Sequence, residues 1–566
     1  MSFNSMGKMM IYIKTHAVLI FVVALTGILF RLIFIFHQAI YIDEAAYLPG
    51  SIKSLVAVTH FPIDTSVLNS TPTVPEFYQI IYGVIGYISN GFSIPQVVHY
   101  TYLNYVSPHV LIRSRLLLMI ANVVVATFVL SKFYNVNKNL ALAFGVFYFL
   151  NPVIIFNTSL FDWPSLFIPV MLLLIIEIYD SKLNLNKRGI AASILFGLSV
   201  SIQFYGIFFY VLPLLLFLSM QPSISYKSTL KFYAAFTAIA ALTILLLNPG
   251  YTINPYQAFH EILIATSVDI GTSSGVFGIP IMLFGRLTYQ VPLYVPILDV
   301  IFETPLIQLI FALIGAYLCS MMILKRKQIS VASSSNFYNL VVFASLVTLS
   351  MLVFDLSFNL MRRNYIMLIA PLLIVSSFGF GLLIDLMWKG RVQDNSENSS
   401  MNSSEISKGD EQTKYGKAVV YLVVAMVIAL SFYSVVSNVD NLPVYSNELT
   451  QLAGFSGANF DGAWNSPQAD MYVGNYIESH GLENHTILTL ALTAMVVYYA
   501  PGNNYLQVWN AVNGTYLEKN FGGDYVVVDE WYVQSWGNPI IEYPHDFNVI
   551  YFVSLTGGYS ILAMIK

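Results

Sequence analysis

Residues 15–37 read THAVLIFVVALTGILFRLIFIFH, an apolar run of membrane-spanning length with one arginine, Arg31, inside it. A helix needs about 20 mostly apolar residues to cross the hydrocarbon core of a bilayer. Further runs of this kind lie at 114–131, 139–157, 164–180, 189–204, 206–220, 230–248, 299–324, 333–355, 365–388 and 417–436. The sequence therefore predicts an all-α polytopic membrane protein with about 11 transmembrane helices.

The composition supports this class. Of the 566 residues, 57% are hydrophobic and 10% are charged, and the mean hydropathy is +0.68. Soluble domains carry about 25% charged residues, so a soluble enzyme is excluded, and nucleic acid is not expected as a partner. The single cysteine, Cys319, excludes an intrachain disulfide.

The lysines and arginines near the span ends predict the orientation, because they collect on the cytoplasmic side of a membrane. With the N-terminus in the cytoplasm, most of them fall on the inner side: Lys8, Lys14, Lys132, Lys138, Lys182, Lys187, Arg188, Lys227, Lys231, Lys325, Arg326, Lys327, Lys389, Arg391, Lys408, Lys414 and Lys417. The outer side receives Lys53, Arg113, Arg115, Arg286, Arg362 and Arg363. We therefore expect a multi-pass protein with an extracytoplasmic C-terminal region.

The chain divides into four predicted parts. They are a transmembrane bundle at 1–388 with outer loops at 38–113 and 248–298, a disordered cytoplasmic loop at 389–416, a last transmembrane helix at 417–436, and an extracytoplasmic domain at 437–566. The loop is predicted to be disordered because it is polar and rich in Ser and Asn. The last part lacks cysteine, which favours a prokaryotic plasma membrane, including an archaeal one, over a eukaryotic lumen.

The C-terminal part has the composition of a small α/β domain. Strand-like runs lie at Thr486–Leu490, Tyr525–Val528 and Val549–Val553, and Gln468–His480 has helical spacing followed by Gly481. It contains twelve acidic residues and two basic ones, Lys519 and Lys566. It offers no recognisable catalytic motif, so we look for the chemistry in the bundle.

Charged residues on the outer side of the bundle are the candidate site. Asp43 and Glu44 follow the first span, Asp162 lies in a short outer turn, and His260 and Glu261 lie in the second outer loop. Five of the six outer bases are arginine, whose planar group binds phosphate in a bidentate manner. The alternative is that these arginines pair with the acids and stabilise the mouth of the bundle.

Four motifs occur in a fixed order over about residues 20–385. They are Arg31 followed by Ile42-Asp43-Glu44-Ala45-Ala46-Tyr47, then Arg115-Leu116-Leu117, then Asn151-Pro152 with Asp162, and then Arg362-Arg363-Asn364-Tyr365 with Pro371. This ordered set resembles the GT-C superfamily of polyprenyl-phosphate-sugar glycosyltransferases, which includes protein O-mannosyltransferases and the lipid A aminoarabinose transferase. Two departures indicate a distant branch: a His-Pro-Pro motif appears as Thr71–Glu76, and a lysine is replaced by Gln203.

The resemblance implies transfer of a sugar from a polyprenyl or dolichyl phosphate donor to a glycan, lipid or protein acceptor. Asp43 would be the general base, and Glu44 would position it or bind a divalent cation. The donor phosphate would be held by Arg115, Arg362, Arg363 and Tyr365, and Asp162 would orient the acceptor or an arginine. His260, Glu261 and Tyr47 are additional candidates.

Two other functions remain open. A transporter or flippase for a lipid-linked or anionic substrate would use the same cavity as a passage, although such proteins tend to contain internal repeats, which this sequence lacks. An oligosaccharide ligase resembling the oligosaccharyltransferases would carry an Asp-x-Asp motif in the first outer loop and Trp-Trp-Asp in the last domain. Neither motif occurs, which favours transfer of a single sugar.

Overall fold

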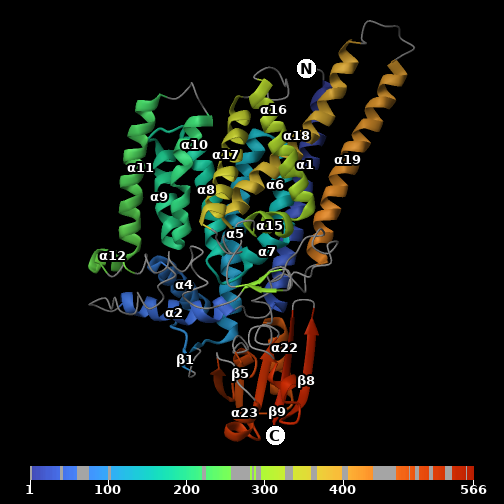
Figure 1. Cartoon of the computed structure of the whole chain (residues 1–566). Helices are drawn as coiled ribbons and strands as arrows, with labels where there is room; N and C mark the ends of the chain where they lie inside the picture. The colour runs from blue at the N-terminus through green and yellow to red at the C-terminus, as the bar shows by residue number, and fades with distance from the viewer. Residues whose placement is uncertain are drawn as a thin grey trace.

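The computed structural model describes residues 3–38, 42–59, 75–99, 104–219, 225–256, 260, 281–283, 286–288, 295–325, 335–358, 366–397, 406–437, 467–482, 485–490, 496–508, 514–529, 538–555 and 558–566. It has two parts, a helical bundle and a small C-terminal domain (Figure 1). The C-terminal domain lies at the end of the bundle opposite to the N-terminal end of the first helix (Figure 1).

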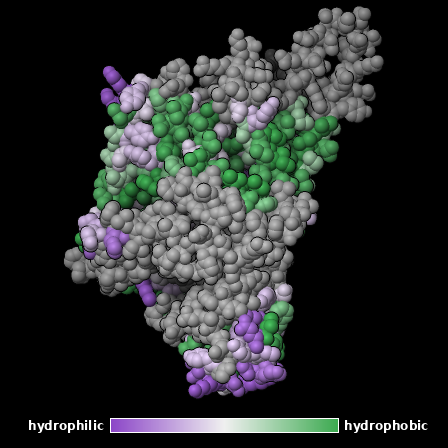
Figure 2. Space-filling model, viewed as in Figure 1, coloured by the Kyte–Doolittle hydropathy of each residue, from purple (hydrophilic) through white to green (hydrophobic). Residues whose placement is uncertain are grey.

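The helices of the bundle coincide with the eleven apolar runs. They are α1 (Phe3–His37), α5 (Pro108–Val136), α6 (Lys138–Phe149), α7 (Pro152–Ser159), α8 (Pro164–Ser181), α9 (Lys187–Ile202), η1 (Phe204–Val211), α10 (Leu212–Ser219), α11 (Tyr226–Leu247), α15 (Val295–Glu303), α16 (Leu306–Lys325), α17 (Ser335–Phe358), α18 (Ile366–Glu397) and α19 (Ile406–Val436). Among the described residues, six helices are long and apolar enough to cross a membrane alone. In Figure 2, hydrophobic residues form large patches on the coloured part of the bundle surface, with fewer polar residues between them. The prediction of a polytopic helical membrane protein is therefore confirmed.

Two predicted spans are interrupted at proline. The run 139–157 becomes α6 and α7, which are bent by 63°, and Pro152 begins the second helix after the Asn151 side chain accepts hydrogen bonds from the next two free amides. The run 299–324 becomes α15 and α16, separated by Thr304 and Pro305. Proline lacks an N–H and clashes with the preceding turn, so a helix is often interrupted there.

Arg31 provides hydrogen-bond donors at the bend between α6 and α7. Its guanidinium is fully buried and donates to the carbonyl oxygens of Tyr148 at 3.2 Å and Phe149 at 3.5 Å, and to Thr158 Oγ1 at 3.4 Å. Carbonyl groups at a helix end have no partner within the helix. The arginine supplies those partners from α1.

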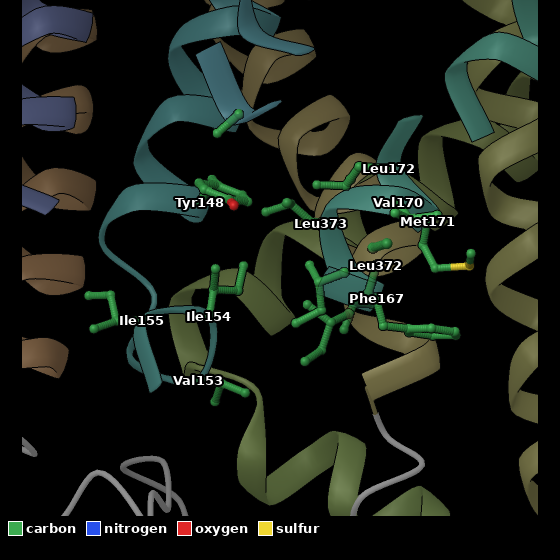
Figure 3. Close-up of a cluster of buried hydrophobic side chains, with 14 of the residues drawn as sticks. Tyr148, Val153, Ile154, Ile155, Phe167, Val170, Met171, Leu172, Leu372 and Leu373 are labelled. Atoms are coloured by element: carbon green, nitrogen blue, oxygen red, sulfur yellow. The ribbon is translucent and has the colours of Figure 1, made fainter. Parts of the chain in front are cut away.

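The core of the bundle surrounds the same bend. Side chains from α6, α7, α8 and α18, including Tyr148, Ile154, Phe167 and Leu372, gather in one buried cluster (Figure 3). This packing holds the short α7 and the turn that follows it in a defined place.

Two further helices, α2 (Ile42–Thr59) and α4 (Glu76–Ser89), lie across the end of the bundle nearest the C-terminal domain (Figure 1). They approach closely because Gly83 lacks a side chain: a Cβ there would lie 2.3 Å from the carbonyl oxygen of Ser51. The short α12 (Pro249–Ile253) and two strand pairs, β1 (Val98–His99) with β2 (Asn104–Tyr105) and β3 (Ile281–Leu283) with β4 (Arg286–Thr288), belong to the two predicted outer loops.

The C-terminal domain contains a five-stranded sheet in the order β6-β5-β7-β9-β8. Its elements are α22 (Pro467–Ser479), β5 (Thr486–Leu490), β6 (Asn504–Val508), α23 (Gly514–Phe521), β7 (Tyr525–Asp529), α25 (Pro539–Glu542), β8 (Phe547–Leu555) and β9 (Gly558–Ile565). The first three strands of the sheet are parallel, and β9 and β8 are antiparallel to their neighbours. The predicted α/β domain is confirmed.

The polar segment 389–416 differs from its prediction. Helix α18 continues to Glu397 and α19 starts at Ile406, so most of the segment is helical. A polar sequence lacks the apolar stripe from which a helix is predicted, but a helix already formed in an adjoining span can continue into it, because adding a residue costs less than nucleation.

Candidate active site

Glu44 and Arg115 form a buried ion pair at the end of the bundle nearest the C-terminal domain (Figure 1). Glu44 lies in the first turn of α2 and Arg115 in the second turn of α5. Arg115 Nε donates to Glu44 Oε1 at 2.8 Å, and Nη2 donates to Oε2. The two side chains are 1% and 0% exposed. This bidentate arrangement is the strongest geometry available to a carboxylate and an arginine.

The remaining face of Arg115 holds the end of the first span. Its Nη1 donates to the carbonyl oxygens of Ile35 at 3.4 Å and Gln38 at 3.2 Å. The guanidinium therefore joins the end of α1 to the start of α2. This geometry favours the ion-pair interpretation of Arg115 over its predicted contact with the donor phosphate.

Glu44 also contacts the turn between α7 and α8, which contains Asp162. The amide nitrogen of Phe161 donates to Glu44 Oε1 at 2.7 Å. Asp162 itself is buried, and its Oδ1 accepts a hydrogen bond from the amide of Trp163 at 2.7 Å, at the start of α8. Three of the predicted residues, Glu44, Arg115 and Asp162, thus lie in one cluster built from α2, α5 and the turn between α7 and α8.

Tyr82 of α4 completes this cluster, although no pattern in the sequence selects it. Its hydroxyl donates to the carbonyl oxygen of Asp162 at 2.6 Å and contacts Ser165 Oγ. Burial raises the pKa of Tyr82 well above its usual range, and the negative charges of Asp162 and Glu44 raise it further against the opposing hydrogen bond with Ser165. The phenol therefore stays protonated and acts as a donor.

Asn122 holds the same turn from within α5. Its Nδ2 donates to the carbonyl oxygens of Ser165 at 2.7 Å and Thr158 at 3.4 Å. An asparagine inside an apolar span is costly unless it has partners. This polar position in the run 114–131 was the available sequence signal for the contact.

Aromatic rings connect Tyr47 to the cluster. The ring of Tyr47 contacts Tyr78 at a centroid distance of 5.5 Å, Tyr78 contacts Tyr82 at 4.2 Å, and Tyr82 contacts Phe161 at 4.5 Å. Such edge and tilted contacts stabilise packed rings beyond the area that they bury. Tyr47 is therefore a supporting residue at the edge of the cluster in this structure.

A second set of contacts joins the start of α4 to the region of α12. The amide of Gly250 donates to Glu76 Oε2 at 2.7 Å, and the amide of Phe77 donates to Asn248 Oδ1 at 2.9 Å. Asn248 Nδ2 donates in turn to Ser201 Oγ at 2.9 Å. The start of α4 is thus attached to the junction of α11 and α12, and through it to α9.

The C-terminal domain reaches the cluster through Tyr499, which lies close enough to Arg115 for an electrostatic interaction. Gly474 of α22 makes room for this tyrosine, because a Cβ there would lie 2.5 Å from the Cβ of Tyr499. The hydrophobic core is continuous from the bundle into this domain. The domain is therefore docked beside the candidate site.

The other predicted residues are not brought into the cluster by the described structure. Arg362, Arg363, Tyr365 and Glu261 lie outside the described residues, as does the side chain of Asp43, whose backbone is in the first turn of α2. His260 is exposed and has no hydrogen bond to the cluster within the described part of the chain. Among the residues described, no group of three or more His, Cys, Asp or Glu is placed to hold a metal ion.

Comparisons with known proteins gave a weak structural similarity. No family model and no curated protein matches the sequence. Crystal structures of ArnT from Cupriavidus metallidurans, in the apo state and bound to undecaprenyl phosphate, are similar at 12% identity, with TM-scores of 0.45 and 0.46. The alignments cover 99% and 98% of this chain and 98% of each ArnT chain. These values do not identify the family, so a functional assignment depends on the residues of the chain itself.

Proposed function

We propose that this protein is a membrane glycosyltransferase that moves a sugar from a polyprenyl or dolichyl phosphate donor to an acceptor on the outer face of the plasma membrane. The observation that carries the proposal is the buried cluster of Glu44, Arg115 and Asp162, which joins three of the four GT-C-like motifs at one end of the bundle. The acceptor is a glycan, a lipid or a protein.

Asp43 is the general base in this proposal. It lies next to Glu44 in the first turn of α2, and Glu44 is fixed by Arg115 and by the amide of Phe161. The pair therefore sets the position of the backbone that carries Asp43. A carboxylate at that place can take the proton of an acceptor hydroxyl that comes within hydrogen-bonding distance.

The reaction is a single displacement with inversion at the anomeric carbon. The acceptor oxygen forms a bond to this carbon while its proton passes to Asp43. The bond between the carbon and the phosphate oxygen breaks, and the lipid phosphate leaves with the electron pair. Arg362, Arg363 and Tyr365 stabilise the negative charge that grows on the phosphate.

Arg115, Glu44, Asp162 and Tyr82 act as positioning residues. Their polar groups bind one another and the ends of α1, α2 and α8, rather than pointing away from the protein as phosphate ligands would. A divalent cation bound by Glu44 would have to displace Arg115 and the amide of Phe161 from its oxygens. We therefore propose that Glu44 positions Asp43 without a cation.

The test is sugar transfer from a lipid-phosphate donor by the Asp43→Asn variant in membranes. Loss of the base should reduce turnover by about 10²-fold or more. Asp180→Asn is the matched control, because Asp180 pairs with Lys132 at the other end of the bundle, at 3.0 Å, and its replacement should change turnover less than tenfold. Retained turnover by Asp43→Asn at normal membrane levels would exclude Asp43 as the base.

A further inference from the structure

The C-terminal end of α4 carries a small apolar surface that the proposed reaction does not use. Ile88, Phe92 and Ile94 are 37%, 70% and 54% exposed. The neighbouring Arg113, in the second turn of α5, is also exposed. We call these four side chains the outer patch.

Phe92 is held outward by an unusual backbone conformation. Its φ angle is 60°, after Gly91 at 69°, and its amide donates to the carbonyl oxygen of Tyr87 at 3.0 Å, which closes the end of α4. L-residues other than Asn and Asp avoid this region of backbone space. A phenylalanine kept there with most of its surface exposed indicates a surface that has to be apolar.

Arg113 lies on the lipid-facing side of α5. Residues seven, eleven and fifteen positions later on the same helix, Ile120, Val124 and Phe128, are 53%, 63% and 40% exposed. With 3.6 residues per turn these positions share a broad face with Arg113, and Ile120 lies about 10 Å further along the helix. A face that is apolar over this length in a membrane protein contacts acyl chains, so Arg113 lies at the level of the lipid headgroups.

The guanidinium of Arg113 retains donors for a ligand. Arginine has five N–H donors, and within the described part of the chain Arg113 makes one hydrogen bond, from Nη1 to the carbonyl oxygen of Ser89 at 3.3 Å. Arg113 is absent from the three ion pairs found among the described residues. The bond to Ser89 holds the group beside the last residue of α4, three positions before Phe92 in the chain.

We propose that the outer patch binds a phospholipid of the outer leaflet, with the lipid phosphodiester on Arg113 and the acyl chains against Phe92 and Ile94. Arginine binds phosphate oxygens with two parallel hydrogen bonds, and a helix end with exposed apolar residues inserts at the boundary between headgroups and acyl chains. This site fixes α4, and with it Tyr82, at a set depth in the membrane. It involves none of the residues proposed for the chemistry.

The depth of the patch is measured with a nitroxide on Phe92→Cys in a Cys319→Ser background, in nanodiscs of phosphatidylcholine and phosphatidylglycerol. The label should collide with oxygen readily and with a water-soluble nickel chelate several-fold less often than the same label at Tyr516→Cys, an exposed site in the C-terminal domain. Ile120→Cys serves as the lipid reference. A label at 92 with the nickel accessibility of position 516 would overturn the proposal.

The phosphate contact is measured by native mass spectrometry of protein released from the same nanodiscs, which contain no polyprenyl phosphate. Arg113→Gln should retain about one phosphatidylglycerol fewer than the unchanged protein. Arg113→Lys should retain an intermediate number, because lysine keeps the charge but lacks the planar guanidinium that binds phosphate with two hydrogen bonds. Lys519→Gln, an equal change of charge far from the bundle, should retain the full number. Equal retention by Arg113→Gln and the unchanged protein would also overturn the proposal.

Discussion

At the scale of single residues, the cluster depends on the ion pair between Glu44 and Arg115. Both charged groups of this pair are buried and have lost their contact with water. Desolvating two ions is costly, and their attraction offsets this cost only when the geometry is good. Removal of one partner would leave the other charged and buried.

Glu44→Gln should therefore destabilise the protein by about 3–5 kcal/mol. The measurement is the apparent unfolding temperature in detergent, followed by tryptophan fluorescence. Asp180→Asn is the control, because Asp180 and its partner Lys132 are both partly exposed, at 34% and 25%, so that its loss should cost about 1 kcal/mol or less. If Glu44→Gln were as stable as Asp180→Asn, the pair of Glu44 and Arg115 would have no structural role.

At the scale of elements, the bends and crossings of the bundle occur where polar side chains or small residues permit them. At the break between α6 and α7, Asn151 and Arg31 form hydrogen bonds with backbone groups that have no partner within the helices. Gly83 allows α2 and α4 to approach closely. Gly250 has the same role between α4 and α12. A Cβ at this glycine would lie 1.8 Å from Glu76 Oε1, so the carboxylate could not keep its place.

Gly250→Ala should consequently separate α4 from α12 and increase hydrogen exchange at the start of α4 by about tenfold or more, which corresponds to about 1.4 kcal/mol of local stability. Gly145→Ala is the matched control, because its added Cβ would meet Leu130 at an ordinary contact distance of 3.5 Å. Unchanged exchange in Gly250→Ala would show that the loops are held together by other contacts.

The buried carboxylates of the C-terminal domain make its stability dependent on pH. Asp470 of α22 accepts a hydrogen bond from Ser560 Oγ at 2.9 Å. Burial, together with the charge of Asp529, raises the pKa of Asp470 well above its usual range, although the bond from Ser560 opposes the rise. The folded domain therefore binds this proton more tightly than the unfolded chain does.

Stability from this group is fully present below the unfolded pKa of about 3.9 and is lost as the pH rises through the higher folded value. For each pH unit between the unfolded and the folded pKa of Asp470, the free energy of unfolding falls by about 1.4 kcal/mol. Asp470→Asn should flatten this dependence and raise the apparent unfolding temperature of the full chain at pH 7, measured from pH 4 to 8. Glu518→Gln, at an exposed site, is the control. A steeper dependence in Asp470→Asn would contradict the assignment.

Sequence could predict the elements better than the contacts between them. The spans follow from run length and apolarity, and β5 follows from its local composition, so each was found without knowledge of its neighbours. The breaks at Asn151 and Pro305 depend on single residues, and hydropathy averaged over a window of about 20 residues does not detect them. The pairing of Glu44 with Arg115 joins positions 71 residues apart, and the alternative interpretations of the outer arginines could be separated only by seeing which acid faces which base.

At the scale of the whole molecule, the structure places the C-terminal domain and the first turn of α9 at opposite ends of the bundle (Figure 1). The distribution of lysine and arginine predicts that the domain is outside. The prediction is tested in a Cys319→Ser background with single cysteines at Lys519 and Lys187, both of which are exposed.

A membrane-impermeant maleimide should label position 519 in intact cells, and position 187 only after the membrane is opened. Labelling of position 187 alone in intact cells would reverse the orientation. Labelling of both positions in intact cells would contradict the arrangement of the two parts on opposite sides.

The guanidinium of Arg31 also has a consequence for biosynthesis. A charged residue at the centre of an inserting helix costs about 2.5–3.5 kcal/mol on the scale of the cellular insertion machinery, and Arg31 lies within the apolar span Ala17–His37, where a charge is still unfavourable. The acceptors that satisfy Arg31 outside its own helix, at residues 148, 149 and 158, are at least 117 positions later in the chain. The first helix must therefore enter the bilayer on the strength of its apolar residues, and it gains its lasting partners only after the ribosome has completed α7.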